Sequence, residues 1–207
     1  TFVLYAGDAV KDFAGNRMHR PDFNFGLTEP AKKEDIVFNE ILFNPLPDDP
    51  DYLEFYNNSE SIIDASGLYL ASVSQSGDTS SLRPVSDIRR CITPGSFYAI
   101  STDREKTISR YSGSVSDNIF EVSSLPSMPD DKGHLLLFDR KLDLIDELKY
   151  DEDMHFSLLS GNEGISLEKI RPGISSNDPA SWHSASESSG WGTPGAINSV
   201  YFAVPRE

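Results

Sequence analysis

Three glutamates lie within segments that are otherwise mainly apolar, and carboxylates in such places are candidates for chemistry. They are Glu40 in V-F-N-E-I-L-F, Glu54 in D-Y-L-E-F-Y and Glu168 in G-I-S-L-E-K. A buried carboxylate can act in acid–base catalysis, hold a cation, or accept hydrogen bonds at the end of a sheet. No nucleophile or base lies at a fixed spacing from these glutamates. We therefore predict the last of these roles, with backbone or side-chain groups as donors.

An acidic, proline-rich loop offers the best oxygen ligands for a cation. Asp48, Asp49 and Asp51 lie in the segment N-P-L-P-D-D-P-D. Calcium prefers several oxygens from one flexible segment, but the order D-x-[DN]-x-[DN]-G is missing here. The sequence therefore predicts an exposed acidic loop, with calcium at these three residues as the alternative.

A second, weaker candidate for a metal site is formed by Asp151, Asp153 and His155. The histidines as a set share no metal-ligand spacing, and Cys91 is the single cysteine. The sequence therefore favours neither a zinc site nor a disulfide within the chain. Cys91 precedes a turn, and we predict a small buried residue there rather than a reactive thiol. No cofactor other than calcium is expected.

Motifs of nucleophilic and phosphate chemistry are missing from the sequence. It contains no G-x-S-x-G elbow, no Walker loop and no H-E-x-x-H. A Ser-His-Asp triad has to meet only in space, so the sequence leaves it open without singling out a residue. Trp182 and Trp191 are candidates for stacking on a sugar or a peptide. Because Ser, Gly and Pro flank them, we predict instead that they pack in the core or at its edge. Since the catalytic motifs are missing, we expect that the chain is not an enzyme.

The stretch 35–57 organises the predicted fold as strand, loop and strand. Prolines at positions 45, 47 and 50 end the backbone pairing, and residues 52–56 restart it. The first strand is apolar on both faces, which is typical of a strand between two layers. Strict alternation places Ile36, Phe38 and Leu42 on one face and Val37, Ile41 and Phe43 on the other.

Short strands separated by turn signals continue along the chain, and no apolar helical pattern persists for three turns. A short helical turn is expected near 103–106, and an exposed hairpin or mobile loop at 72–87. The clearest hairpin joins 134–139 to 142–150 across Arg140-Lys141. This pattern predicts an all-β sandwich. Further strands are expected at 61–69, 96–100 and 164–170, and residues 200–204 form either a last strand or the exit linker.

Composition and charge restrict the possible partners. The chain has 207 residues, 38% of them hydrophobic, so it can bury the core of one domain or of one domain plus a fragment. Lys and Arg number 18 against 33 Asp and Glu, a net charge of −15. Such a surface repels nucleic-acid phosphates and anionic membranes, whereas cations and neutral or basic partners fit it. No apolar run approaches the ~18 residues of a membrane span.

Nine segments assemble in an order that resembles a known family. They are V-F-N-E-I-L-F-N-P, D-Y-L-E-F-Y-N-N, I-D-A-S-G-L-Y-L, T-P-G-S-F-Y-A-I, L-P-S-M-P-D-D-K-G-H-L-L-L-F-D, L-I-D-E-L-K-Y, G-I-S-L-E-K-I, S-W-H-S-A and G-T-P-G-A-I-N-S. From Asp35 to about Ser199 they resemble the bacterial form of the lamin tail domain, also called the intermediate-filament tail domain. Lys169 departs from the family, where Arg is frequent, and this weakens a bidentate carboxylate contact. The signature positions are Asn39, Glu40, Glu54, Asn57, Gly67, Pro94, Gly95, Gly164, Glu168, Trp182, Pro194, Gly195 and Asn198.

The resemblance implies an Ig-like β-sandwich of two packed, mainly antiparallel sheets. It also implies a non-catalytic module of a larger secreted or cell-surface bacterial protein, which serves adhesion, spacing or substrate targeting. Its protein or glycan ligand is not identified by the sequence. The first alternative is an accessory domain that completes or regulates a neighbouring hydrolase, such as a nuclease or phosphatase. The second alternative is a calcium-stabilised adhesion domain. All three are extracytoplasmic, and we expect a monomer when the chain is excised.

Residues 1–34 differ in character from the rest. The chain opens on T-F-V-L-Y without methionine, so we expect a piece of a longer polypeptide. The segment D-F-A-G-N at 12–16 resembles the last hairpin of bacterial Ig-like repeats. This implies that 1–34 are the tail of an upstream Ig-like module plus a linker. The predicted sandwich domain is then 35–200, and 201–207 form an exit linker.

Overall fold

Strand β4 (Ile36–Leu42) is buried along its whole length and lies inside the larger of the two main sheets. It pairs antiparallel with β5 (Tyr52–Asn57) on one side and with β14 (Leu167–Lys169) on the other. The computed structural model describes residues 2–5, 10–17 and 22–201. The predicted strand, loop and strand over 35–57 are confirmed.

Each main sheet is built from segments far apart in the chain. The larger sheet also contains β10 (Phe97–Ser101), β11 (Ile119–Glu121) and β15 (Trp182–Ser184), in the order β11-β10-β5-β4-β14-β15. The four-stranded sheet contains β7 (Leu68–Ser72), β8 (Arg83–Pro84), β12 (Lys132–Asp139) and β13 (Leu144–Asp151), in the order β13-β12-β7-β8. A third sheet contains β3 (Thr28–Glu29), β6 (Ile62–Asp64) and β9 (Cys91–Ile92).

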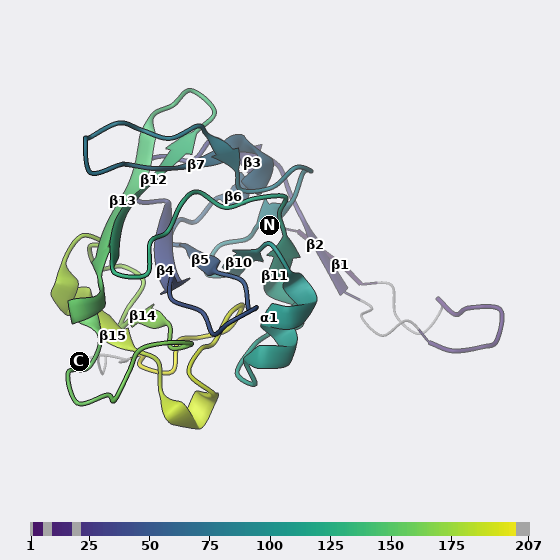
Figure 1. Cartoon of the computed structure of the whole chain (residues 1–207). Helices are drawn as coiled ribbons and strands as arrows, with labels where there is room; N and C mark the ends of the chain where they lie inside the picture. The colour runs from purple at the N-terminus through teal and green to yellow at the C-terminus, as the bar shows by residue number, and fades with distance from the viewer. Residues whose placement is uncertain (1, 6–9, 18–21, 202–207) are drawn as a thin grey trace, which may run out of the picture.

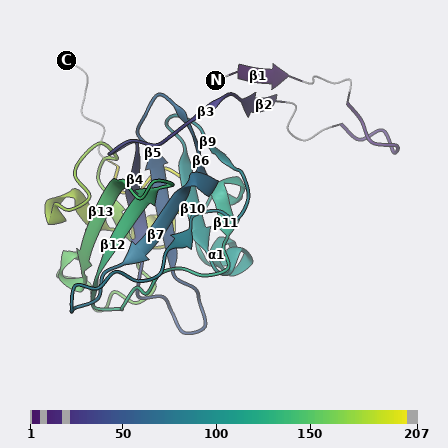
Figure 2. The same cartoon turned by 90° about the horizontal axis from the view of Figure 1, so that it is seen from above.

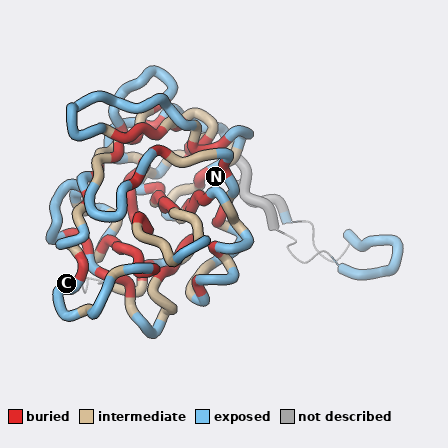
Figure 3. Tube along the Cα trace, viewed as in Figure 1, coloured by how far each residue is buried: buried red, intermediate tan, exposed pale blue. Residues whose placement is uncertain are grey.

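The two main sheets form two layers around one core. In Figure 2, β7, β12 and β13 lie in front of β4, β5 and β10. Buried residues run through the middle of the molecule, and exposed residues follow its rim (Figure 3). The core includes Phe38, Phe55, Ile100, Leu70, Leu135 and Leu148, which come from both layers. Burial of these side chains from water is the main force that holds the layers together. The predicted all-β sandwich is confirmed.

Local elements agree with several turn signals in the sequence. The expected helical turn is α1 (Arg104–Arg110), and the Asp103 carboxylate caps it by accepting a hydrogen bond from Lys106 N at 3.0 Å. Strands β7 and β8 pair across residues 74–82, which are exposed, so an exposed hairpin is confirmed there. The 3₁₀ turns are η2 (Ala65–Gly67), η3 (Ser116–Asn118), η4 (Glu152–Met154), η5 (Pro179–Ser181) and η6 (Glu187–Ser189).

A β-bulge in β4 breaks the strict alternation of side chains. Phe38 lies opposite Phe55 and Glu40 lies opposite Glu54, so Asn39 is an extra residue on β4. One extra residue moves every later side chain of the strand to the other face of the sheet.

The predicted division of β4 into two faces is therefore wrong beyond the bulge. Ile41 and Phe43 lie in the main core together with Phe38. Leu42, which strict alternation places beside Phe38, belongs to a smaller apolar cluster that includes Tyr52. The prediction failed because alternation counts residues, and a bulge adds one residue without adding a pairing position.

The predicted burial is wrong for Cys91 and correct for Trp182. Cys91 is exposed, so the prediction of a buried thiol is wrong. It alternates with Ile92 on a two-residue strand, and Ile92 takes the core position. Trp182 is buried, and its Nε1 donates to the Ser176 carbonyl at 2.9 Å, whereas Trp191 is partly buried. Packing in the core is confirmed for Trp182, whereas packing of Trp191 at the edge remains a prediction.

The N-terminal part of the chain contributes a separate hairpin and one sandwich strand. β1 (Phe2–Tyr5) and β2 (Asp22–Phe25) pair antiparallel and lie apart from the sandwich in both views (Figures 1 and 2). Further along, β3 pairs in parallel with β6, and Ala31 belongs to the main core. The chain thus joins the sandwich before the boundary predicted after residue 34.

The division into 1–34, 35–200 and 201–207 remains a prediction. Beyond Tyr201 the predicted exit linker lies outside the described residues. A search of the described ranges finds no helix with the length and apolar character that a membrane crossing needs.

Candidate functional site

Glu40, Glu54 and Glu168 form a row across three neighbouring strands. Glu40 on β4 lies directly opposite both Glu54 on β5 and Glu168 on β14. All three have 0% exposure. The bulge at Asn39 turns Glu40 away from the main core, to the outer face where the other two point. Like charges directly opposite one another destabilise a sheet, so the row requires compensating partners.

The segment 191–200 supplies partners to the whole row. It follows the last strand, and none of its residues, all of which are described, lies in a helix or strand. It is drawn in yellow in Figure 1. Three of its main-chain N–H groups donate to the row, one to each glutamate: Thr193 N to Glu40 at 2.9 Å, Gly195 N to Glu54 at 2.5 Å and Val200 N to Glu168 at 3.1 Å. This segment therefore covers the outer face of the larger sheet as a third layer.

Side-chain hydroxyls complete the environment of Glu40. Its Oε1 accepts from Tyr52 OH and Ser166 Oγ, each at 2.6 Å, in addition to Thr193 N. Three donors on one oxygen stabilise a buried carboxyl group that has no basic partner among them.

The other two glutamates are also held by several donors. Glu54 Oε1 accepts from Asn39 Nδ2 at 2.7 Å. Glu168 Oε2 accepts from Ser199 Oγ at 2.7 Å, next to its bond with Val200 N. Each glutamate of the row thus accepts hydrogen bonds from backbone and side-chain donors, as predicted from the sequence.

The Thr193 hydroxyl lies between two carboxyl groups. Its Oγ1 is 3.2 Å from Glu40 Oε2 and 2.8 Å from Glu168 Oε1. A hydroxyl carries one proton, so both contacts are hydrogen bonds only if one carboxyl group is protonated and donates to Oγ1. Burial, together with the negative charge of Glu168, raises the pKa of Glu40 to about 8. Burial also raises the pKa of Glu54 and of Glu168. The row therefore retains a proton at neutral pH.

Asn198 bridges the bulge and the neighbouring strand. Its Nδ2 donates to the main-chain carbonyls of Asn39 at 3.0 Å and Lys169 at 2.8 Å. Its Oδ1 accepts from Asn39 Nδ2 at 2.7 Å. The pairing of β4 with β14 ends at Glu40, next to the bulge in the ladder between β4 and β5, and the side-chain amide supplies donors to the carbonyls beyond this end.

The geometry of the row does not suit acid–base catalysis. A general acid or base must come within hydrogen-bond reach of a substrate proton. The three carboxyl groups are inaccessible to solvent, and the donors around them belong to the protein itself. Their raised pKa values follow from burial and from one another, which is also common in structural clusters.

The acidic loop directs two of its aspartates toward cationic side chains. The main-chain carbonyl of Asp48 accepts from Lys106 Nζ at 2.8 Å. Asp49 Oδ2 lies 3.6 Å from Arg110 Nε. Lys106 and Arg110 of helix α1 thus contact oxygen atoms of the loop that a calcium ion would need as ligands.

The third aspartate of the loop lies elsewhere. Asp51 is partly buried, and burial together with the negative charge of Asp130 raises its pKa to about 7. Within the described ranges, no three His, Cys, Asp or Glu side chains are placed to hold a metal ion. The structure does not bring Asp48, Asp49 and Asp51 together as one ligand set.

The second metal candidate is also dispersed. The Asp151 carboxylate accepts from Asp153 N at 3.0 Å and caps the turn η4. His155 is buried, and its Nδ1 lies 3.0 Å from Ser184 Oγ. Each residue has a local structural contact instead of a shared ion.

The pair of His155 and Ser184 brings an imidazole and a hydroxyl together, as nucleophilic catalysis requires. However, Ser184 Oγ also accepts from Phe156 N at 2.9 Å, and both side chains are buried. His155 Nε2 has no hydrogen-bond partner within the described part of the chain, so no carboxylate orients the ring. Burial lowers the pKa of His155 to about 4. The pair lacks the third member and the access that a catalytic triad needs.

The remaining signature positions shape the backbone. Asn57 Nδ2 donates to the carbonyls of Ser61 and Ile92, each at 2.8 Å. Gly67 ends η2, Pro94 and Gly95 form the turn before β10, Gly164 precedes β14, Trp182 begins β15 and Pro194 lies in the covering segment.

Sequence reasoning missed the hydroxyl donors of the row. Ser166 and Thr193 are separated from Glu40 by 126 and 153 positions, and no local pattern marks them. The topology alone brings them together.

Sequence reasoning also missed that Lys169 is buried. Lys169 has 0% exposure, and burial lowers its pKa to about 8. Its Nζ donates to Ser176 Oγ at 3.2 Å, and Ser176 Oγ donates to Asp146 Oδ2 at 2.6 Å. Lys169 therefore reaches a carboxylate through a serine.

Comparisons with known proteins add no relative. No protein-family model matches the chain, and a search of curated proteins finds no significant match. The resemblance to lamin tail domains rests on the residue patterns.

Proposed function

We propose that this chain is a non-catalytic β-sandwich module that provides structure and a binding surface within a larger secreted or cell-surface protein. The observation that carries this proposal is the row of glutamates at positions 40, 54 and 168. These are the carboxylates that the sequence marks for chemistry, and all of them are covered by the chain itself.

Two further features support a module without its own catalytic centre. The pair of His155 and Ser184 has no carboxylate that orients the imidazole. The acidic loop engages Lys106 and Arg110 with Asp48 and Asp49. The first pair thus offers no exposed nucleophile, and the acidic loop offers no set of unengaged oxygens to a cation.

Membership of the lamin tail family and a secreted or cell-surface location are part of the same proposal. They are supported by the order of the nine sequence segments given above. The location is tested by protease treatment of intact producing cells. Degradation of the chain without cell lysis is expected, and full protection by an intact cell envelope contradicts the location.

Catalysis is tested with the purified chain on single-stranded DNA, RNA, p-nitrophenyl phosphate and p-nitrophenyl acetate. We expect no turnover above buffer. The matched variants are Glu40→Gln, His155→Ala and, as an exposed control, Glu121→Gln. Turnover that scales with protein concentration, and that a folded Glu40→Gln or His155→Ala variant loses while Glu121→Gln retains it, overturns the proposal.

A further inference from the structure

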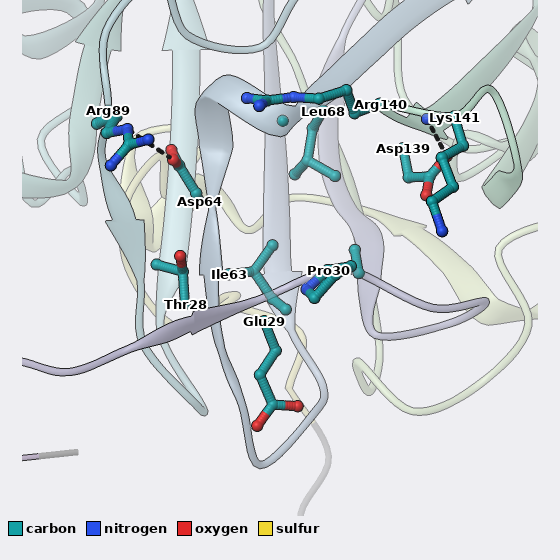
Figure 4. A pocket seen from close by; sticks show the side chains of 12 residues that line it. Thr28, Glu29, Pro30, Ile63, Asp64, Leu68, Arg89, Asp139, Arg140 and Lys141 are labelled. Carbon is teal, nitrogen blue, oxygen red and sulfur yellow. Dashed lines mark hydrogen bonds and ion pairs between the residues drawn. The ribbon is translucent and has the colours of Figure 1, made fainter.

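A pocket of about 290 Å³ lies where the N-terminal part of the chain meets the sandwich. Four parts of the chain line it: β3 with Pro30, the segment from β6 to β7, Arg89 just before β9, and the turn between β12 and β13 (Figure 4). Its size lies near the lower end of small-ligand sites, about 300–1,000 Å³. The pocket is separate from the glutamate row, and no part of the proposed function depends on it.

The middle of the pocket is apolar. Ile63 and Leu68 each have 1% exposure and belong to the main core. Figure 4 shows their side chains, with Pro30, between the cationic residues of the pocket. Ile63 and Leu68 thus form an apolar floor, and the exposed Pro30 adds apolar surface that a short apolar group would cover.

Cationic side chains surround this apolar middle, although the protein as a whole carries a net charge of −15. Arg140 and Lys141 come from the β12–β13 turn, and Arg89 comes from the opposite wall. Arg140 extends across the pocket above Leu68 (Figure 4). Its Nη2 lies over Gly67, 4.0 Å from the position where a Cβ would stand.

The cations differ in how far they are already engaged. Arg89 Nε lies 3.8 Å from Asp64 Oδ2. In the described ranges, the side-chain nitrogens of Arg140 and Lys141 have neither a hydrogen-bond nor an ion-pair partner. Two positive charges at the pocket are therefore available to a ligand.

The acidic side chains of the pocket are engaged by the protein. Each of the three accepts hydrogen bonds from neighbouring residues: Glu29 from Ser61 Oγ at 2.9 Å, Asp64 from Ser66 N at 3.0 Å and Oγ at 2.9 Å, and Asp139 from the backbone N–H of Lys141 and Asp143, each at 2.8 Å. These donors are neutral, so the three carboxylates keep their negative charges and balance the three cations of the lining. The groups left without partners are the side-chain nitrogens of Arg140 and Lys141, and an anionic ligand would pair with these.

We propose that this pocket binds a carboxylate joined to a short apolar chain. The guanidinium of Arg140 pairs with the carboxylate, since its planar fork of N–H donors matches two carboxylate oxygens. Lys141 adds a second positive charge, and the apolar chain lies on Ile63, Leu68 and Pro30. The same chemistry occurs in a free short-chain carboxylic acid and in the C-terminal carboxylate of a peptide with an apolar last residue.

The test is a titration of the isotopically labelled chain, followed by amide chemical shifts. The probes are hexanoate, its neutral counterpart hexanamide, and acetate, which lacks the apolar chain. Hexanoate is expected to shift amides at 63–68 and 139–141 with saturation below about 10 mM, and both other probes to bind at least about tenfold more weakly. No saturable shift with hexanoate, or equal binding of hexanamide, overturns the proposal.

Matched variants separate the Arg140 contact from general charge effects. Arg140→Gln and Arg171→Gln remove the same charge from exposed positions, and Arg171 does not line the pocket. Arg140→Gln is expected to weaken hexanoate binding about tenfold, whereas Arg171→Gln leaves it unchanged. Arg140→Lys keeps the charge but loses the fork, so an intermediate loss is expected. Equal losses in Arg140→Gln and Arg171→Gln contradict a specific site.

A further pair of probes identifies the source of the carboxylate. N-acetyl-leucine mimics a peptide C-terminus, and N-acetyl-leucinamide is its neutral control. Tighter binding of N-acetyl-leucine than of hexanoate supports the site with a peptide terminus as its ligand, and the reverse order supports it with a free acid. A negative result at this pocket has no bearing on the turnover test of the non-catalytic module, so each of the two proposals can be contradicted without the other.

Discussion

Glu40 and Glu168 lie on either side of a single hydroxyl group, that of Thr193, at 3.2 Å and 2.8 Å. Each carboxyl group belongs to a different strand, and the threonine belongs to the segment that covers both. One proton shared among these groups relieves the repulsion between two buried carboxylates. The proton is thus part of the folded structure, and its loss should weaken the fold.

The first prediction concerns the stability of the protein between pH 6.5 and pH 8. The pKa of Glu40 is about 8 in the folded chain against 4.5 without burial, so the folded state binds the additional proton between these values. This contribution to stability is full below pH 4.5 and is lost as the pH rises through 8. We expect the free energy of unfolding to fall by about 1–2 kcal/mol from pH 6.5 to pH 8 in urea titrations.

Below pH 6.5, His155 changes the free energy of unfolding in the opposite direction, so the effect of Glu40 is separate from it only between pH 6.5 and pH 8. The pKa of His155 falls from 6.5 to about 4 on burial, so its contribution to stability increases with pH up to 6.5. Asp51 adds a smaller decline in stability above pH 6.5, because its pKa is raised from 3.8 to about 7. Glu40→Gln should therefore reduce the decline above pH 6.5 without abolishing it, whereas the exposed Glu121→Gln should retain it in full. A decline of the same size in Glu40→Gln would assign it to other groups.

The second prediction concerns Asn198. Replacement by Ala removes the donors of two buried carbonyls, those of Asn39 and Lys169. Buried acceptors without partners cost about 1–3 kcal/mol each, so we expect a loss of about 2–4 kcal/mol. Urea denaturation measures it. Ile197→Ala is the control in the same segment, because Ile197 is 57% exposed and should lose little. Similar losses in both variants contradict the bridging role.

The third prediction concerns Gly195, whose main-chain N–H donates to Glu54. Its φ is +81°, and a Cβ would lie 2.5 Å from the Val115 carbonyl oxygen. Gly195→Ala therefore combines a strained backbone with a collision, and we expect a loss above about 2 kcal/mol.

Two other glycines separate these causes. Gly77 has φ +90° in open space, so Gly77→Ala measures the backbone strain by itself. Gly161 has neither a positive φ nor a neighbour within 4 Å. Thermal unfolding should rank the losses Gly195→Ala, Gly77→Ala, Gly161→Ala from largest to smallest. If Gly195→Ala loses no more stability than Gly77→Ala, the Cβ at position 195 does not collide with the Val115 carbonyl.

The fourth prediction concerns calcium. Lys106 and Arg110 already contact Asp48 and Asp49, so calcium would have to displace two cations. We expect millimolar calcium and a chelator to give melting temperatures within about 1 °C of each other. A rise with calcium that Asp49→Asn removes would support the alternative of a calcium-stabilised domain.

Local signals in the sequence were sufficient for most strands. The hairpin across Arg140-Lys141 is present as β12 and β13, because its alternation and turn residues act over a short distance. Glu40 and Glu54 were expected to accept hydrogen bonds, since a carboxylate within an apolar strand has few other stable states.

The errors have a physical origin at particular residues. Asn39 fits a regular strand as well as a bulge, so alternation could not place Leu42 on its correct face. Ile92, and not Cys91, takes the buried position of a strand too short to show a period. Thr193 lies 153 positions from Glu40, and a contact over this distance depends on the whole topology.

The covering segment also has a consequence for the synthesis of the protein. Translation delivers the chain from its N-terminus at about 5–20 residues per second. Strands β4, β5 and β14 leave the ribosome before the amides of Thr193, Gly195 and Val200 that their glutamates require. A nascent chain that ends at β15 still lacks these main-chain donors, one for each carboxyl group of the row. Emergence of Val200, rather than of the last strand, therefore determines when this sandwich can complete its folding.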